Sequence, residues 1–230
     1  MAANNVNVVL AHGAWADGSS WARVITALKS EGADVVAAPL PLTSLADDVA
    51  ALDKTIARLD GPVVLVAHAY AGAVIAETKS ASVKALVYVT ALAPDQGETV
   101  ADVFYRAAPH PLAPKLAPDG SGLIWLPYAA FATAFAQHAS REDLAVLAAV
   151  QRPISPACIT VPVGRPRWKD VQSWFLLAED DRMIVSETQR FMAERMKATV
   201  RTHAVDHTPI VTAPSVVTDI VREATVAVAG

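Results

Sequence analysis

Short apolar runs alternate with amphipathic helical segments along most of this chain. The first run, Val6–Ala11, stops at a glycine turn, and Ser20–Lys29 then places its apolar residues at helical spacing. Apolar strands that alternate with helices predict an α/β fold, with a mostly parallel central sheet flanked by helices. The predicted strands are Val6–Ala11, Asp34–Ala38, Val63–Ala67, Ala85–Thr90, Trp174–Ala178 and Val200–Val205. The other predicted helices are a segment from Ser44 to about Leu59, then Ala71–Lys79, Glu187–Met196 and Pro214–Val226.

The alternation is interrupted between about residues 94 and 169. This interval holds most of the prolines and two alanine-rich helical stretches, Phe131–His138 and Arg141–Ala149. We interpret it as a helical cap inserted into a single domain that spans residues 1–230. Open α/β sheets bind ligands at the carboxyl ends of their strands, which is where such a cap would lie.

Composition narrows the class of protein. Hydrophobic types make up 53% of the 230 residues, but 46 of those residues are alanine, so the larger apolar side chains reach only an ordinary globular content. With 19 basic and 23 acidic residues, and a net charge of −4, the chain has no positive field for nucleic acid. A single cysteine, Cys158, cannot form an intramolecular disulfide.

The sequence also predicts where the protein acts and what it binds. Residues 1–5 do not resemble a signal peptide, and no apolar stretch reaches the ~18 residues of a membrane span, so we expect a cytoplasmic protein without a membrane partner. No histidine and carboxylate cluster has ligand spacing, so we expect no metal, and no cofactor motif is present. The expected partner is a small-molecule substrate or ligand. Whether the protein forms a homodimer is left open by the sequence.

The strongest local signal is the segment Val63–Gly72, in which a buried strand runs directly into a helix. A G-x-S-x-G pentapeptide at such a turn projects a serine nucleophile. Here Ala69 occupies the serine position, and Ala67 and Ala71 replace the two flanking glycines. Taken alone, the segment fits an ordinary strand-to-helix turn of alanines equally well.

Together with residues elsewhere in the chain, this segment resembles the α/β-hydrolase superfamily. Within it the chain is most similar to the small capped group of hydroxynitrile lyases and plant methyl esterases. The order of elbow, acid and histidine is the order of that family, and the similarity covers essentially the whole chain. The matching features are His12-Gly-Ala-Trp15 with Gly18-Ser-Ser-Trp21, the segment His68–Ile75, Glu179–Ile184 with Gln189, and Asp206-His207-Thr-Pro209.

The resemblance implies a base and an acid. His207, after the last strand, corresponds to the catalytic base, and Asp181 corresponds to the acid that orients its ring. Glu179 and Asp180 are adjacent alternatives for the acid, and the register with the following Arg182-Met-Ile184 favours Asp181.

The resemblance further implies an oxyanion hole from the backbone N–H groups of Ala14 and Tyr70. Such donors are unaffected by the loss of the serine. His12, Trp15 and the cap aromatics are also explained as loop or packing residues. The candidate substrate-pocket residues are His12, Trp15, Ser20, Tyr105 and Trp125, with Ser19, His110 and His138 as weaker candidates.

The alanine at position 69 decides which chemistry is available. A methyl group cannot attack a carbonyl, so an acyl-enzyme route is excluded for this chain. Either alanine was introduced in place of a serine or it is the native residue, and the parallel changes at Ala67 and Ala71 favour the second explanation.

If Ala69 replaces a serine, the protein is an ordinary Ser-His-Asp esterase captured as a Ser→Ala variant. If alanine is native, three functions stay open. In the first, a His207–Asp181 dyad activates water toward a small apolar ester, lactone or related carbonyl compound. The alternatives are a non-catalytic binding protein and a hydroxynitrile-lyase-like lyase. Cys158, the only thiol, has no evident base and is a poor candidate for a replacement nucleophile.

Overall fold

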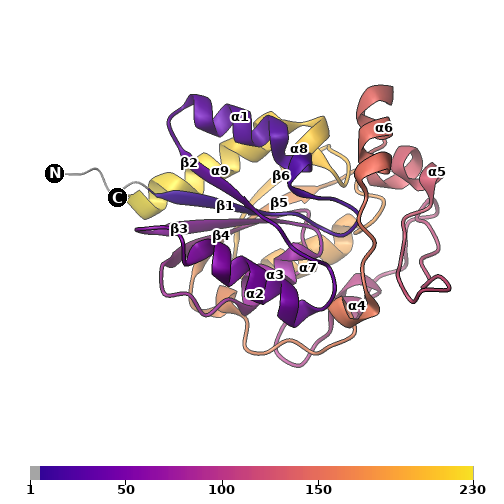
Figure 1. Ribbon diagram of the computed structural model, residues 1–230, viewed down its shortest axis with the longest axis horizontal. Helices are drawn as coiled ribbons and strands as arrows, with labels where there is room; N and C mark the ends of the chain where they lie inside the picture. The colour runs from indigo at the N-terminus through magenta and orange to yellow at the C-terminus, as the bar shows by residue number, and fades with distance from the viewer. Residues whose placement is uncertain (1–5, 230) are drawn as a thin grey trace.

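Six parallel strands form one sheet at the centre of the protein (Figure 1). The computed structural model describes residues 6–229. The strands follow the order β2-β1-β3-β4-β5-β6, and every neighbouring pair is parallel. The predicted α/β fold is confirmed. The strands are β1 (Asn7–Ala11), β2 (Asp34–Ala38), β3 (Val63–His68), β4 (Val83–Val89), β5 (Gln172–Ala178) and β6 (Thr199–His203).

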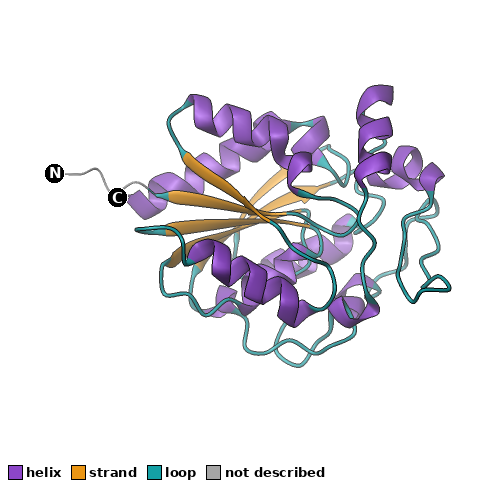
Figure 2. Ribbon diagram, viewed as in Figure 1, coloured by secondary structure: helices purple, strands orange, loops and turns teal. Residues whose placement is uncertain are grey.

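Helices cover both faces of this sheet (Figure 2). Helices α1 and α9 lie on one face, and α2, α3 and α7 lie on the other. Because both faces are covered, the central strands are buried along their whole length, which explains their continuous apolar sequence. The helices are α1 (Ala22–Ser30), α2 (Leu45–Ile56), α3 (Ala71–Glu77), α7 (Ser186–Arg195), α8 (Pro209–Thr212) and α9 (Pro214–Ala229).

Local hydrogen bonds set where two of the helices begin. The side chain of Ser44 accepts from the backbone N–H of Asp47 and so caps α2 at its first turn. Before α1, the side chain of Asp17 caps a 3-10 turn, Gly18–Trp21, so the predicted helix from Ser20 is preceded by a tighter turn.

Residues 94–169, which we call the 94–169 insertion, leave the sheet after β4 and return at β5. Its helices α5 and α6 lie beyond the carboxyl ends of the strands (Figure 1). The predicted helix Phe131–His138 is instead a five-residue π-helix, Phe131–Phe135, and loops fill much of the remainder. The insertion contains α4 (Val100–Phe104), α5 (Tyr128–Ala130), α6 (Arg141–Val150) and the 3-10 turns Pro156–Cys158 and Arg167–Lys169.

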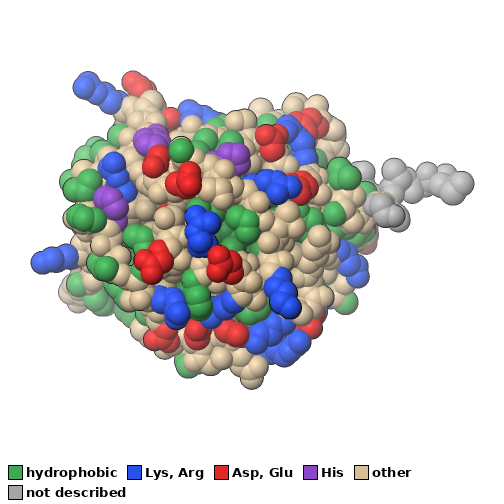
Figure 3. Space-filling view, turned by 180° about the vertical axis from the view of Figure 1, so that it is seen from behind, with side chains coloured by type: hydrophobic (Ala, Val, Ile, Leu, Met, Phe, Trp, Pro, Cys, Tyr) green, Lys and Arg blue, Asp and Glu red, His purple; other side chains and the backbone are tan. Residues whose placement is uncertain are grey.

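The surface is mixed in charge. Basic and acidic side chains are interspersed on the face drawn in Figure 3. None of the helices within residues 6–229 has the length and apolar character needed to cross a bilayer.

Candidate active site

The turn between β3 and α3 holds Ala69 in a strained conformation. Its φ of 51° lies in the left-handed region, which costs an L-residue roughly 1–2 kcal/mol. The backbone carbonyl of Ala69 accepts hydrogen bonds from the N–H groups of Gly72 and Leu92, which fix the turn. A Cβ on Gly72 would lie 2.3 Å from the Leu92 carbonyl oxygen, so only glycine fits there. The turn therefore has the backbone form of a nucleophile elbow, with a methyl group at its tip.

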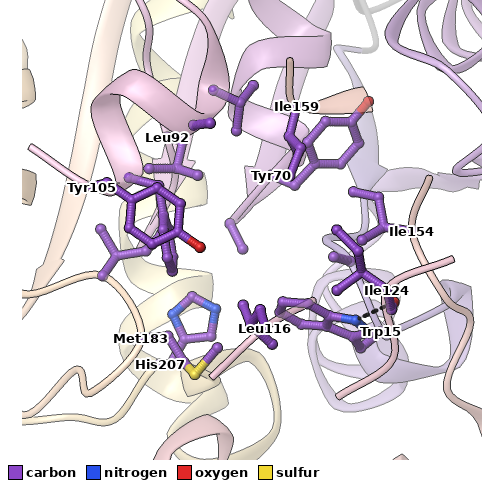
Figure 4. Close-up of a pocket in the computed structure, with 16 residues that line it drawn as sticks. Trp15, Tyr70, Leu92, Tyr105, Leu116, Ile124, Ile154, Ile159, Met183 and His207 are labelled. Carbon is purple, nitrogen blue, oxygen red and sulfur yellow. Dashed lines mark hydrogen bonds between the residues drawn. The ribbon is translucent and has the colours of Figure 1, made fainter. Parts of the chain in front are cut away.

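His207 and Asp181 form a buried pair at the carboxyl ends of the sheet. His207 Nδ1 donates to Asp181 Oδ2 over 2.9 Å, and the two residues are 2% and 3% exposed. This bond fixes the tautomer, because an ionised carboxylate only accepts. The other ring nitrogen, Nε2, then carries the lone pair. His207 also lines an apolar cavity, toward which its ring is directed in Figure 4.

The Asp181 carboxylate is held by three further donors. The backbone N–H groups of Met183 and Ile184 donate to Oδ1, and Gln189 Nε2 donates to Oδ2 over 2.9 Å. Glu179 and Asp180, the alternatives, are exposed. Of the three adjacent acidic residues, Asp181 is the one that the fold places against His207.

The backbone of His207 is held as firmly as its side chain. Its carbonyl oxygen accepts from His68 Nε2 over 2.7 Å and from Thr90 Oγ1 over 2.9 Å. Burial, with the nearby His207 as a second cause, lowers the pKa of His68 to about 3, so His68 is neutral near pH 7. Thr90 has a φ of 45°, which is rare for a β-branched residue. Strain at Thr90 thus accompanies a hydrogen bond to the loop that carries His207.

Two residues that line the same cavity have backbone N–H groups without a protein acceptor. Ala14 and Tyr70 both line it, and within residues 6–229 neither N–H donates to another protein atom. A Cβ on Gly13 would lie 2.9 Å from the Ala69 Cβ, so the loop after β1 approaches the elbow closely only because of this glycine. The Tyr70 ring turns away from the cavity, and its hydroxyl donates to Asp48 over 2.7 Å.

The cavity is apolar and lies between the sheet and the 94–169 insertion. The space between its lining atoms is ≈ 670 Å³, open solvent included. None of its lining residues is charged at neutral pH unless His207 is protonated. The lining residues are Ala14, Trp15, Ala69, Tyr70, Leu92, Val100, Ala101, Phe104, Tyr105, Leu116, Ile124, Ile154, Ile159, Met183, Ile184 and His207.

Of the five predicted pocket residues, only Trp15 and Tyr105 line this cavity. His12 does not line it: the residue is buried in the loop after β1, and its ring bonds the Gly13 carbonyl. Trp125 is 44% exposed and lies outside the cavity lining.

Ser20 does not line this cavity either. Its hydroxyl donates to the Asp17 carbonyl, and it lies in a separate groove beside α6 with Ser19. His110 and His138 do not line the cavity either.

A buried network behind Tyr70 was not predicted. Asp48 is fully buried and accepts from the Leu42 N–H, the Tyr70 hydroxyl and, over 3.7 Å, the Cys158 thiol. Burial raises the pKa of Asp48, and burial together with Asp48 raises that of Cys158 to about 12. Cys158 is therefore a protonated structural thiol near pH 7 and not a nucleophile.

The Asp48 network has no signature in the sequence, because Asp47-Asp48 at the start of α2 has the ordinary acidic pattern of a helix N-terminus. Thr90, also missed, had a usable signal. It directly follows an apolar strand, as His12 and Ala69 do, and the carboxyl ends of parallel strands meet at one edge of a sheet.

Comparisons with known proteins identify the family and the fold. Residues 8–220 match the sequence model of the family described as "Alpha/beta hydrolase family". A search of curated protein sequences finds no match.

Several solved structures share the fold at low sequence identity. The chain is similar to polyneuridine aldehyde esterase, with 20% identity and a TM-score of 0.83 over 95% of this chain and 98% of that one. A pyrethroid hydrolase from Sphingobium faniae is 20% identical, with a TM-score of 0.75 over 96% of this chain and 98% of that one. A tomato methylketone synthase I H243A variant, complexed with β-ketoheptanoate, is 17% identical, with a TM-score of 0.80 over 95% of this chain and 97% of that one.

Proposed function

Because this chain belongs to the alpha/beta hydrolase family, we propose that it acts on a small apolar ester, lactone or related carbonyl compound without a covalent intermediate. The observation that carries the proposal is the buried 2.9 Å bond from His207 Nδ1 to Asp181, which leaves Nε2 free at an apolar cavity. An oriented imidazole with one free nitrogen is suited to general-base catalysis. The 94–169 insertion acts as the cap, since it supplies half of the cavity lining.

Hydrolysis at this site begins with water. His207 Nε2 takes a proton from a water molecule as the water oxygen bonds to the substrate carbonyl carbon. Because Ala69 carries a methyl group, no serine hydroxyl competes for Nε2. The negative charge that develops on the carbonyl oxygen is stabilised by the N–H groups of Ala14 and Tyr70.

The second step uses the proton that His207 has gained. The bond from the carbonyl carbon to the alkoxy oxygen breaks, and the imidazolium gives its proton to the departing oxygen. An acid and an alcohol are released, or a hydroxy acid from a lactone. Asp181 stays ionised and stabilises the imidazolium between the two steps.

Comparing rates with and without His207 tests the proposal. The protein is incubated with p-nitrophenyl esters of increasing acyl length and with a set of lactones. We expect His207→Ala to lower the rate by about 10²-fold or more, which is the usual contribution of general acid–base catalysis. The exposed His138→Ala is the matched control. Equal rates in the wild type and His207→Ala would contradict the proposal, and tight binding without turnover would favour a binding protein. A serine codon at position 69 of the parent gene would restore ordinary serine-esterase chemistry.

A second candidate is a lyase that removes CO₂ from a β-keto acid. Two observations favour it. The reaction needs no nucleophile, and Ala69 supplies none. A structural neighbour is a methylketone synthase solved with β-ketoheptanoate. The bond between the carboxylate and the α-carbon breaks, and its electrons pass to the ketone oxygen as an enolate. The Ala14 and Tyr70 N–H groups stabilise that charge, and a proton from water then reaches the α-carbon.

The two candidates differ in their products. With β-ketooctanoate, release of 2-heptanone faster than the spontaneous background would support the lyase. Ester hydrolysis without ketone release would exclude it and leave the hydrolase.

A further inference from the structure

Three of the five nitrogen and oxygen atoms on side chains that line the apolar cavity are bonded to protein partners. Trp15 Nε1 donates to the Ile124 carbonyl over 2.9 Å, as the dashed line in Figure 4 marks. The Tyr70 hydroxyl donates to Asp48, and His207 Nδ1 donates to Asp181. Two nitrogen or oxygen atoms of lining side chains then stay free within residues 6–229: His207 Nε2 and the hydroxyl of Tyr105.

Tyr105 lies where an entering molecule would meet it. The residue is 58% exposed and also lines the cavity, so it lies at the mouth. Its ring and hydroxyl are directed toward the cavity interior, on the side of His207 (Figure 4). Tyr70, by contrast, presents only its backbone and ring edge.

The backbone around Tyr105 is fixed before any ligand arrives. A reciprocal capping box between Thr99 and Asp102 defines the start of α4, and the N–H of Tyr105 donates to the Ala101 carbonyl at its end. The Tyr105 ring packs edge-to-face on Phe104, with 4.9 Å between centroids. A ligand therefore meets a tyrosine whose backbone is already in place, so that only its side chain has to be ordered to form a new hydrogen bond.

We propose that the Tyr105 hydroxyl donates a hydrogen bond to the substrate and selects neutral molecules that combine an apolar body with a carbonyl oxygen. It supplies, from the insertion, a hydroxyl donor at a site whose elbow carries only a methyl group. The inference rests on the proposed function for the choice of substrate, but it concerns binding and not turnover.

Two ligands of matched shape test it, and calorimetry measures their dissociation constants. Acetophenone has a carbonyl acceptor and ethylbenzene lacks one. Tyr105→Phe removes only the hydroxyl, so we expect it to weaken acetophenone binding about 3- to 10-fold, the range for one neutral hydrogen bond. Ethylbenzene binding should not change. Tyr128→Phe, which alters a 75% exposed tyrosine of the same insertion outside the cavity lining, is the matched control and should change neither.

The remaining outcomes overturn the inference. Equal weakening of both ligands would show that Tyr105 acts through packing, and unchanged acetophenone binding, or no binding of either ligand to the wild type, would show that its hydroxyl makes no contact. A failure of the proposed hydrolysis can be told apart from a failure of this inference. A wild type whose acetophenone affinity depends on Tyr105, but whose ester hydrolysis does not depend on His207, would keep the inference and discard the mechanism.

Discussion

The two ends of the candidate site differ in how complete they are. At the acid–base end, the Asp181 carboxylate has four hydrogen-bond donors, and both the ring and the carbonyl of His207 are held. At the elbow end, Ala69 keeps a left-handed φ of 51° but presents only a methyl group. Backbone strain of this kind normally accompanies a nucleophile.

Strain without a nucleophile indicates a second use for the same turn. Tyr70, which follows Ala69, lines the cavity, and the glycines at 13 and 72 allow the close approaches around this turn. In the proposed mechanism this backbone stabilises negative charge on a substrate oxygen, a role that does not depend on a serine.

Restoring the serine has the largest expected effect. If the elbow end lacks only a hydroxyl, Ala69→Ser should place Oγ near His207 and raise hydrolysis of p-nitrophenyl esters by about 10³-fold, part of the roughly 10⁶-fold that a full triad provides. A burst of p-nitrophenol, and a mass increase equal to one acyl group in the intact protein, would identify the acyl-enzyme.

The double variant Ala69→Ser/His207→Ala is the control for this gain. Since the new serine needs a base, the double variant should lose the gain and the burst. No gain in the single variant, with folding intact by circular dichroism, would mean that the elbow and His207 are not aligned for attack, and the two ends would then not form one site.

A substitution of Asp181, at the acid–base end, has the next largest expected effect. Asp181→Asn replaces an acceptor-only carboxylate with an amide that can donate to His207 Nδ1, which favours the wrong tautomer. We expect a loss of about 10²-fold in turnover with little change in KM, since Asp181 does not line the cavity. Asp180→Asn, one residue away and exposed, is the matched control. Equal effects of the two variants would argue that Asp181 has only a general electrostatic role.

Periodicity and chain order were enough to predict the frame of the molecule. The strand from Val63 and the helix from Ala71 begin at the residues expected, because a continuous buried run next to a small-residue turn has few other structures. Asp181 was separable from its acidic neighbours only by register, and the structure explains the distinction: the turn directs one carboxylate inward and exposes the other two.

Contacts between distant segments were beyond sequence reasoning. Asp48 and Cys158 lie 110 positions apart and meet only because the insertion folds back over α2. The insertion itself has no sheet to fix its register, so sequence alone cannot place Trp125 relative to the cavity or distinguish the π-helix Phe131–Phe135 from an ordinary helix. Its short helices depend on tertiary packing more than on local propensity.

The smallest expected effect is a change in stability with pH, and it comes from His68, a histidine next to His207 that stays neutral. In the proposed reaction His207 accepts a proton, whereas His68, whose ring centroid lies 4.9 Å away, is held neutral by burial with a pKa of about 3. In the unfolded chain a histidine titrates near 6.5, so the unfolded state takes up this proton first as the pH falls. The stability associated with neutral His68 is complete above pH 6.5 and is lost progressively toward pH 3. Between pH 7 and 5 this loss is about 2 kcal/mol.

Denaturant unfolding at the two pH values measures that loss. His68→Gln keeps an N–H donor for the His207 carbonyl but cannot be protonated, so its stability should fall by about 2 kcal/mol less than that of the wild type over this interval. His12, whose pKa is also lowered by burial, contributes equally to both proteins and cancels in the difference. His138→Gln, at an exposed position, is the control. If both variants lost stability as steeply as the wild type, His68 would not be the neutral donor that holds His207. The fixed position of the His207 backbone would then need another explanation.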